Sequence, residues 1–361
     1  MSDQLTCPLC GQKEQYALID HLRSEHNVAP EVFQARFPEQ PLCSSGFGLF
    51  LAERQVQKQD GVLHYQLDVA GAQMTACYGL EHPLIPEPDT SFIWTDACRD
   101  VAEAIEHNER VFLYGPSGTG KSSLVRQIAA IVQRPVRRVS LNGETSVADF
   151  VGHWTVNESR QTVFVKGLLP QAMEHGHIVQ LDECDAMQPE VGFVIQQVLE
   201  PKGHLLLTDT GEEITPHTDF RLVATANTLG FGCDSGLYAS GTNVLNFSWI
   251  DRWDVVVHLG YLPDKQEVEL LRTRHPSLKK DLLKCIVKAA EDLRKAHAEE
   301  QLTTVVTTRR LLALCARLER GNEFDRALTV CVLNKAPQED AKVLKETFDH
   351  HVGPLAQNAT A

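Results

Sequence analysis

The middle of the chain alternates short apolar runs with longer segments in which apolar residues recur every three to four positions. Short, continuous apolar runs are typical of parallel strands buried on both faces, and the longer segments are typical of the helices that cover such a sheet. We therefore expect an α/β domain over residues 92–262. Its predicted strands are Val111–Tyr114, Val136–Leu141, His177–Leu181, Arg221–Ala226 and Val255–Leu259.

Three other segments alternate apolar and polar residues one by one. Residues 150–170 and 204–220 do so on both sides of a polar turn, which predicts two β-hairpins within the α/β domain. Residues 65–78 show the same alternation, with Gly71 at the expected turn. In a ring-shaped assembly, the first two hairpins would face the axial channel.

The spacing of apolar residues becomes helical from Asp264 onward, and the three prolines of residues 82–89 predict a stiff linker before the α/β domain. These changes divide the chain into four predicted regions. They are a small N-terminal module (1–43), a β and linker region (44–91), the α/β domain (92–262) and a helical lid with its tail (263–361).

The first predicted strand runs directly into a glycine-rich turn that opens a helix. The turn fits G-x-x-x-x-G-K-S, in which glycines let backbone N–H groups converge on phosphate oxygens at a helix N-terminus. Lys121 is expected to reach the β- and γ-phosphates, and the hydroxyl of Ser122 is expected to ligate Mg²⁺. The predicted nucleotide-binding residues are Gly115, Pro116, Ser117, Gly118, Thr119, Gly120, Lys121, Ser122 and Ser123.

Two later strands end in polar residues that belong at the same edge of the sheet. Asp182 and Glu183 follow an apolar strand that Gln180 interrupts, and Asn227 follows the next strand. Asp182 is expected to hold Mg²⁺ through water, and Glu183 to orient and polarise the attacking water. Asn227 would fix that water. The alternatives are a solvated acidic pair and a turn-forming asparagine.

Two arginines are candidates for stabilising charge on a transferred phosphoryl group. Arg252 precedes the fifth predicted strand and would reach the nucleotide of a neighbouring subunit in a ring. The alternative is a surface ion pair with Asp251 or Asp254. Arg309 opens a lid helix and would reach back to the phosphates, and Arg310 is the competing residue.

The N-terminus holds two cysteines and two histidines with the spacing of metal ligands. Cys7 and Cys10 are followed, after ten intervening residues, by His21 and His26. Two thiolates and two imidazoles can close a tetrahedral Zn²⁺ site. The stretch resembles a Cys-Cys-His-His zinc finger, including the bacterial Ros/MucR type, although the usual central spacer is about twelve residues. The alternative is a pair of core cysteines with surface histidines.

Composition narrows the classes of function. The 361 residues are 43% hydrophobic and 23% charged, as in an ordinary globular protein, and the ten cysteines favour thiols and metal ligands over disulfides. The net charge of −14 argues against a broad nucleic-acid-binding surface. Within the N-terminal module six acidic residues outnumber three basic ones, which favours a docking role over DNA binding. Without an apolar membrane span or a secretory signal pattern, we expect a cytoplasmic protein.

The motifs occur in the order found in AAA+ ATPases, and the chain resembles their MoxR-like group with hairpin insertions. Over residues 82–335 it is similar to the CobS-type ATPase subunit of aerobic cobaltochelatases, in stretches such as GLLPQAMEHGHIVQLDECDA, FRLVATANTLGFGCDSGLY and DRWDVVVHLGYLP. The lid motif departs from the family's Ser-Pro-Arg, because Thr307 and Thr308 precede the arginine. The residues that match the family's functional positions are Lys121, Ser122, Asp182, Glu183, Asn227, Arg252 and Arg309.

The resemblance implies an ATP-driven hexameric ring that uses ATP and Mg²⁺. It also implies a partner subunit with a von Willebrand-type metal-binding domain and a large subunit that holds the corrin into which Co²⁺ is inserted. Two alternatives stay open. One is a remodelling ATPase for another client, encoded by a host, phage or mobile element, with the zinc module as adaptor. The other is a zinc-dependent nucleic-acid-binding regulator.

Overall fold

The computed structural model describes residues 5–6, 13–14, 57–59, 62–78, 82–200, 203–230 and 247–353. The chain divides into two compact units, residues 1–68 with 73–81 and residues 69–72 with 82–361. The predicted Zn²⁺ ligands Cys7, Cys10, His21 and His26 lie outside the described residues, so the zinc site stays a prediction.

Short antiparallel strands are described before residue 82. The turn between the two longest strands lies at Ala70 and Gly71, whose φ angles of 55° and 89° are both positive. Positive φ at both central residues is the geometry of a type I′ hairpin turn, which confirms the predicted hairpin. The strands are β1 (Leu5–Thr6), paired with β2 (Lys13–Glu14), and a sheet of β3 (Gln57–Gln59), β4 (Val62–Val69) and β5 (Ala72–Tyr78).

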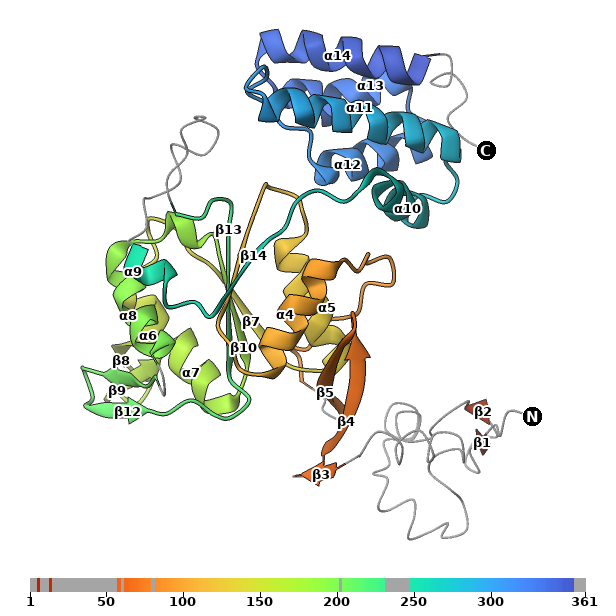
Figure 1. Ribbon diagram of the computed structural model, residues 1–361. Helices are drawn as coiled ribbons and strands as arrows, with labels where there is room; N and C mark the ends of the chain where they lie inside the picture. Colours follow the sequence, from red (N-terminus) through yellow and green to blue (C-terminus); the bar gives the residue numbers. More distant parts are fainter. Residues whose placement is uncertain are drawn as a thin grey trace. The chain divides into compact units, whose positions relative to one another are not determined.

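A parallel sheet forms the centre of the second unit (Figure 1). In the described residues its order is β14-β6-β13-β10-β7, so the strand that precedes the phosphate loop has a neighbour on each side. All five predicted strands are confirmed to within one residue at their ends. They are β6 (Val111–Tyr114), β7 (Val136–Ser140), β10 (Ile178–Asp182), β13 (Arg221–Ala226) and β14 (Val255–His258).

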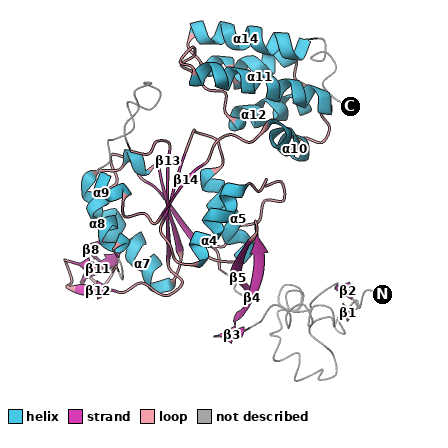
Figure 2. Ribbon diagram, in the orientation of Figure 1, coloured by secondary structure: helices cyan, strands magenta, loops and turns pink. Residues whose placement is uncertain are grey.

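Helices cover both faces of this sheet (Figure 2). One face carries α4 and α5, and α5 begins at Lys121, directly after the glycine loop. The other face carries α6, α7, α8 and α9. The bounds are α4 (Asp96–Glu106), α5 (Lys121–Val132), α6 (Val147–Val151), α7 (Leu168–His175), the 3₁₀ turn η1 (Cys184–Ala186), α8 (Pro189–Leu199) and α9 (Phe247–Ile250).

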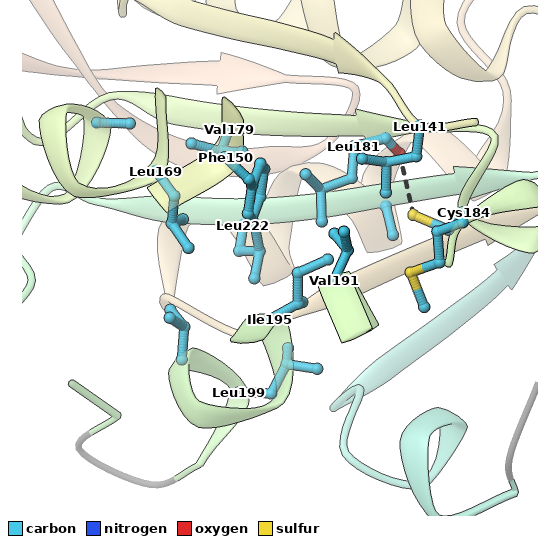
Figure 3. Packing of buried hydrophobic residues seen from close by; sticks show 14 of the residues in the cluster. Leu141, Phe150, Leu169, Val179, Leu181, Cys184, Val191, Ile195, Leu199 and Leu222 are labelled. Carbon is cyan, nitrogen blue, oxygen red and sulfur yellow. Dashed lines mark hydrogen bonds between the residues drawn. The ribbon is translucent and has the colours of Figure 1, made fainter. Parts of the chain in front are cut away.

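The main apolar core of this unit lies between the sheet and α8 (Figure 3). Val191, Ile195 and Leu199 recur every four residues on α8 and are all buried against strand residues such as Val179 and Leu222. Burying each such side chain stabilises the fold by about 1.5–3 kcal/mol. This packing holds β10 and β13 in place, and their carboxyl ends carry the predicted Asp182, Glu183 and Asn227.

Both hairpins predicted within the α/β domain are confirmed. Lys166 connects them to α7, because its Nζ lies 2.6 Å from Oε1 of Glu174 and 2.7 Å from Oε1 of Glu212. Trp154 is 50% exposed and its ring lies 5.5 Å from that of Phe164 on the facing strand. The antiparallel pairs are β8 (Gly152–Val156) with β9 (Thr162–Lys166) and β11 (Leu205–Leu207) with β12 (Glu212–Ile214).

The C-terminal part is helical, as predicted, and has its own apolar core. A buried ion pair crosses it, in which Arg294 donates to both carboxylate oxygens of Glu267 at 2.7 and 2.9 Å. In the described ranges, every helix is too short or too polar to span a bilayer. The helices are α10 (Asp264–Arg274), α11 (Lys280–Ala298), α12 (Thr308–Glu319), α13 (Phe324–Cys331), η2 (Leu333–Lys335) and α14 (Gln338–Val352).

Candidate active site

The glycine-rich turn between β6 and α5 has a backbone that side chains would not permit. Gly115 has φ of +145°, and a Cβ there would lie 2.1 Å from the carbonyl oxygen of Leu259. Gly118 has φ of +80°, and a Cβ there would lie 3.0 Å from the Cβ of Thr307. Gly120, with φ of +93°, caps α5 in the left-handed region. The turn therefore needs Gly115 and Gly118 both for backbone angle and for space, and Gly120 for its backbone angle alone.

Lys121, the first residue of α5, points back over the turn. Its Nζ donates to the carbonyl oxygens of Gly115 at 2.6 Å and of Pro116 at 3.0 Å. It also lies 3.3 Å from Oδ1 of Asn227, at the end of β13. The predicted lysine and the predicted asparagine are therefore brought together, and the ammonium group spans the space that the turn encloses.

The environment of Lys121 lowers the pKa of its ammonium group. Only 8% of the residue is exposed, and burial is the main cause that lowers its pKa from 10.5 to about 8. The carboxylates of Asp185 and Asp182 oppose this effect, and the guanidinium of Arg309 adds to it. An anion bound beside the ammonium group would raise the pKa again, because a nearby negative charge favours the charged lysine.

Asp182, the last residue of β10, is a buried carboxylate at the centre of the site. Its Oδ1 accepts hydrogen bonds from Ser122 Oγ at 3.1 Å, Gln180 Nε2 at 2.8 Å and Thr225 Oγ1 at 2.8 Å. Its Oδ2 accepts from Nε of Arg138. The role of Gln180, which interrupts the apolar strand, is thus to donate to this carboxylate. Sequence reasoning missed Thr225 and Arg138, which come from the two neighbouring strands.

The oxygen atoms at this point suit a hard divalent cation. The hydroxyl of Ser122 and the carboxylate of Asp182 are adjacent, and Mg²⁺ is bound in proteins by one or two such oxygen groups together with substrate phosphates. In the part of the chain that the structure describes, no cluster of three or more His, Cys, Asp or Glu residues is placed to hold a metal ion. The adjacent oxygen atoms of Ser122 and Asp182 are therefore the candidate ligands for such a cation.

Glu183 follows Asp182 in a left-handed conformation, with φ of 59° and ψ of 42°. This conformation is uncommon outside glycine and is concentrated at functional sites. Its side chain is exposed, and Oε2 accepts a hydrogen bond from Ser140 Oγ at 2.9 Å, at the end of β7. Glu183 therefore lies at the edge of the site with one carboxylate oxygen engaged by a neighbouring strand.

A second buried carboxylate, which sequence reasoning also missed, shapes the end of β13. Oδ2 of Asp185 accepts from the backbone N–H groups of Asn227 and Thr228, each at 3.0 Å, and from Thr228 Oγ1 at 3.1 Å. Asp185 is 1% exposed. These bonds fix the turn that presents Asn227 to Lys121. The only signal in the sequence is a third acidic residue shortly after a buried strand.

Two of the cavities beside the phosphate loop share Gly118, Gly120 and Arg309 in their lining. The smaller, about 150 Å³, is lined by the loop together with Asp182, Glu183, Asn227 and Arg309. The larger, about 550 Å³, is lined by Trp94, Tyr261 and other largely apolar residues, and it also reaches Arg309. A small polar space beside a larger apolar one suits the phosphates and the base of a nucleotide.

The two lid arginines differ in what they face. Arg309 lines both cavities, whereas Arg310 donates to the carbonyl oxygen of Lys335 at 3.4 Å. Tyr261 adds a direct contact from the segment after β14 to the phosphate loop, since its hydroxyl donates to the carbonyl oxygen of Ser117 at 3.0 Å. The geometry favours Arg309 over Arg310 as the residue directed to the phosphates.

Arg252 is not brought to this site. It precedes β14, and because β14 runs parallel to β6, its amino end lies at the edge of the sheet opposite the phosphate loop. Its Nε donates to Oε1 of Glu200 at 2.8 Å. The alternative of an ion pair with Asp251 or Asp254 therefore named the wrong carboxylates, since Asp254 receives the backbone N–H of Arg110.

The sequence of the chain is similar to those of known proteins. Residues 110–239 match the family model described as the AAA domain of the dynein-related subfamily. The aerobic cobaltochelatase subunit CobS of a Sinorhizobium species is 34% identical over 277 residues, which cover 74% of this chain and 83% of that subunit. An uncharacterized protein of Staphylococcus saprophyticus is 24% identical over 244 residues, which cover 66% of this chain and 89% of that protein.

Among solved structures, the RuvB Holliday junction branch migration motor of Thermotoga maritima aligns with a TM-score of 0.42 at 17% sequence identity. The alignment covers 74% of this chain and 72% of RuvB.

The low pKa of Lys121 predicts that nucleotide binding is coupled to proton uptake. Above pH 8 the free protein carries a neutral lysine, and binding must protonate it to hold the phosphates. The dissociation constant for ADP should rise about tenfold for each pH unit above roughly 8 and change little near pH 7. Calorimetry in buffers of different ionisation enthalpy measures both the affinity and the number of protons taken up.

The control is Lys121→Met, which removes the titrating group and should bind ADP weakly without this pH dependence. An affinity of the unaltered protein that stays constant from about pH 7 to about pH 9 would show that Lys121 remains charged throughout.

Proposed function

The chain belongs to the family of AAA ATPases that includes the aerobic cobaltochelatase subunit CobS, and we propose that it hydrolyses ATP to drive Co²⁺ insertion into a corrin held by partner subunits. The observation that carries the ATPase activity is the convergence of Lys121, Ser122, Asp182, Glu183 and Asn227 on one small polar cavity. The cobalt part is supported by the similarity to CobS.

The loop and Lys121 would bind the triphosphate. The backbone N–H groups of the turn and the start of α5 are available to phosphate oxygens, and the ammonium group would leave the loop carbonyls to contact the β- and γ-phosphates. Ser122 and Asp182 would hold Mg²⁺, which neutralises charge on the phosphates. The larger cavity next to the loop would receive the base and ribose.

Glu183 is proposed to orient and polarise the water that attacks the γ-phosphorus, giving ADP and inorganic phosphate. Its carboxylate accepts a hydrogen bond from Ser140, so the side chain would turn from this partner toward the water. Asn227 would fix the same water, with its backbone already anchored by Asp185. Arg309 would stabilise negative charge on the γ-phosphate from the side of the helical region.

Arg252 is proposed to act in the site of a neighbouring subunit, within a homo-oligomeric ring that the family resemblance implies to be hexameric. Two features support this role. Arg252 lies at the sheet edge opposite its own loop, and its side chain is 32% exposed and oriented by Glu200. A guanidinium supplied from a neighbour stabilises charge in the transition state and makes hydrolysis depend on assembly.

The proposed partners are a subunit with a von Willebrand-type metal-binding domain and a large subunit that holds the corrin. The N-terminal Cys and His residues are proposed to bind Zn²⁺ and to dock a partner. This part of the proposal rests on the sequence spacing of Cys7, Cys10, His21 and His26, which suits a tetrahedral Zn²⁺ site.

Glu183→Gln is expected to bind ATP with unchanged affinity but to lose turnover by about a hundredfold or more, because only the water-activating group is removed. Fluorescent-nucleotide binding and phosphate release measure the two properties. Glu103→Gln, an exposed position on α4, is the matched control and should behave like the unaltered protein. Normal hydrolysis by Glu183→Gln would remove the assignment of this residue.

Arg252→Ala is expected to bind ADP normally, since its own loop lies at the opposite edge, and to lose turnover about a thousandfold once assembled. In mixtures with Glu183→Gln subunits, part of the activity should return, because an Arg252→Ala subunit keeps an intact catalytic site that the arginine of a Glu183→Gln neighbour can complete. Arg272→Ala, on the exposed surface of α10, is the control. Mixed rings of Arg252→Ala and Glu183→Gln subunits that recover no activity would rule out a role in the neighbouring site.

The cobalt part is tested by reconstitution with both partner subunits, hydrogenobyrinate a,c-diamide, Co²⁺ and ATP. We expect the corrin absorbance change of cobalt insertion with the unaltered protein and none with Glu183→Gln, because insertion is coupled to hydrolysis. The Sinorhizobium CobS subunit with the same partners is the positive control. Steady ATP turnover without insertion, while CobS succeeds, would exclude the corrin as client and leave the ATPase assignment intact.

A further inference from the structure

Arg138 lies beside the buried carboxylate of the site, on the strand next to β10. In the β7–β10 ladder it is directly opposite Gln180, so its side chain reaches diagonally to Asp182, two residues further along. Its Nε donates to Oδ2 of Asp182. The side chain of Arg138 is 54% exposed, whereas that of Asp182 is 3% exposed. A half-exposed cation thus closes over a buried anion.

The two oxygens of Asp182 are occupied differently. Oδ1 already accepts three hydrogen bonds, from Ser122, Gln180 and Thr225. Oδ2 accepts the bond from Arg138. An oxygen that already accepts three hydrogen bonds has little capacity to accept another or to bind a cation. Oδ2 is therefore the atom of Asp182 that can bind a further cation or a cation-bound water.

We propose that Arg138 is a built-in counter-ion that competes with Mg²⁺ for Oδ2 of Asp182 and thereby sets the Mg²⁺ affinity of the nucleotide site. A buried carboxylate without a cation is costly, and the guanidinium supplies the missing charge while no metal is bound. The inference rests on the proposed function in one respect, namely that Ser122 and Asp182 hold Mg²⁺ together with a nucleotide.

The position of Arg138 and the exposure of its side chain both support its replacement by Mg²⁺ at Asp182. Arg138 lines the same small cavity as Lys121, Ser122 and Glu183, so its guanidinium lies where phosphates and metal would enter. Because half of the side chain is already in solvent, Arg138 can swing away with little loss of packing. Asp182 stays fixed by its three other donors. The carboxylate is therefore held ready, and what changes is the cation that faces it.

The test compares the free Mg²⁺ concentration that half-saturates Mg²⁺-dependent binding of a fluorescent ADP. In R138Q this concentration should fall about tenfold. The substitution removes a positive charge that contacts Asp182 and opposes Mg²⁺, and such a charge changes the affinity of a carboxylate for a cation by one or more powers of ten. R138K keeps the charge and should stay close to the unaltered protein. R137Q is the matched control, since Arg137 is the adjacent residue and donates to Nδ1 of His177 instead.

An unchanged or increased half-saturating concentration in R138Q would overturn the inference while leaving the proposed function untouched. If the unaltered protein shows no Mg²⁺-dependent ADP binding, the proposed function fails instead, so the two failures are distinguishable.

A second measurement needs no nucleotide and separates a counter-ion from a packing role. In EDTA, R138Q should melt at a temperature a few degrees lower, because the buried Asp182 then loses the cation that pairs with it directly. In a D182N background the same substitution should leave the melting temperature unchanged, since the neutral amide needs no counter-ion. Equal losses in both backgrounds would contradict the counter-ion role.

Discussion

The need to stabilise one buried negative charge organises the site. The carboxylate of Asp182 lies almost entirely out of solvent, where an ion is tolerated only when hydrogen bonds and a cation compensate for lost hydration. Those groups come from four different elements, with Ser122 on α5, Arg138 on β7, Gln180 on β10 itself and Thr225 on β13. The carboxylate can be buried only if the strands are in this order and register, so sheet and site depend on each other.

The phosphate loop is held from two sides. On the sheet side, Lys121 is bonded to the loop carbonyls, and Asn227 beside it is anchored through its backbone by the buried carboxylate of Asp185. On the other side, the hydroxyl of Tyr261 donates to a loop carbonyl. The ring of Tyr261 lies beneath Arg294, 3.9 Å from the ring centre, and that guanidinium is paired with the buried Glu267. A series of side-chain contacts from Tyr261 through Arg294 to Glu267 thus extends from the loop to residues of α10 and α11.

The candidate functional residues lie at two opposite edges of the parallel sheet. The carboxyl ends of β10 and β13 carry the groups that face the nucleotide cavity, whereas Arg252 lies before the amino end of β14. A side chain at the opposite edge is too distant to act at the phosphate loop of its own subunit. Arg252 is partly exposed and oriented by Glu200, so it fits a site that a neighbouring subunit completes. The same arrangement makes assembly a condition for hydrolysis in the proposed mechanism.

What the sequence alone determined was local. Apolar runs predicted all five strands of the sheet, alternation predicted the hairpins, and the glycine pattern predicted the loop that ends at Lys121, because each feature depends on neighbouring residues. Tertiary structure alone decided which distant groups meet. Arg138 and Asp185 belong to the site, and Glu200 pairs with Arg252, through strand register and helix placement that no short pattern encodes. A charge is recognisable as buried only when the surrounding strands show what excludes water from it.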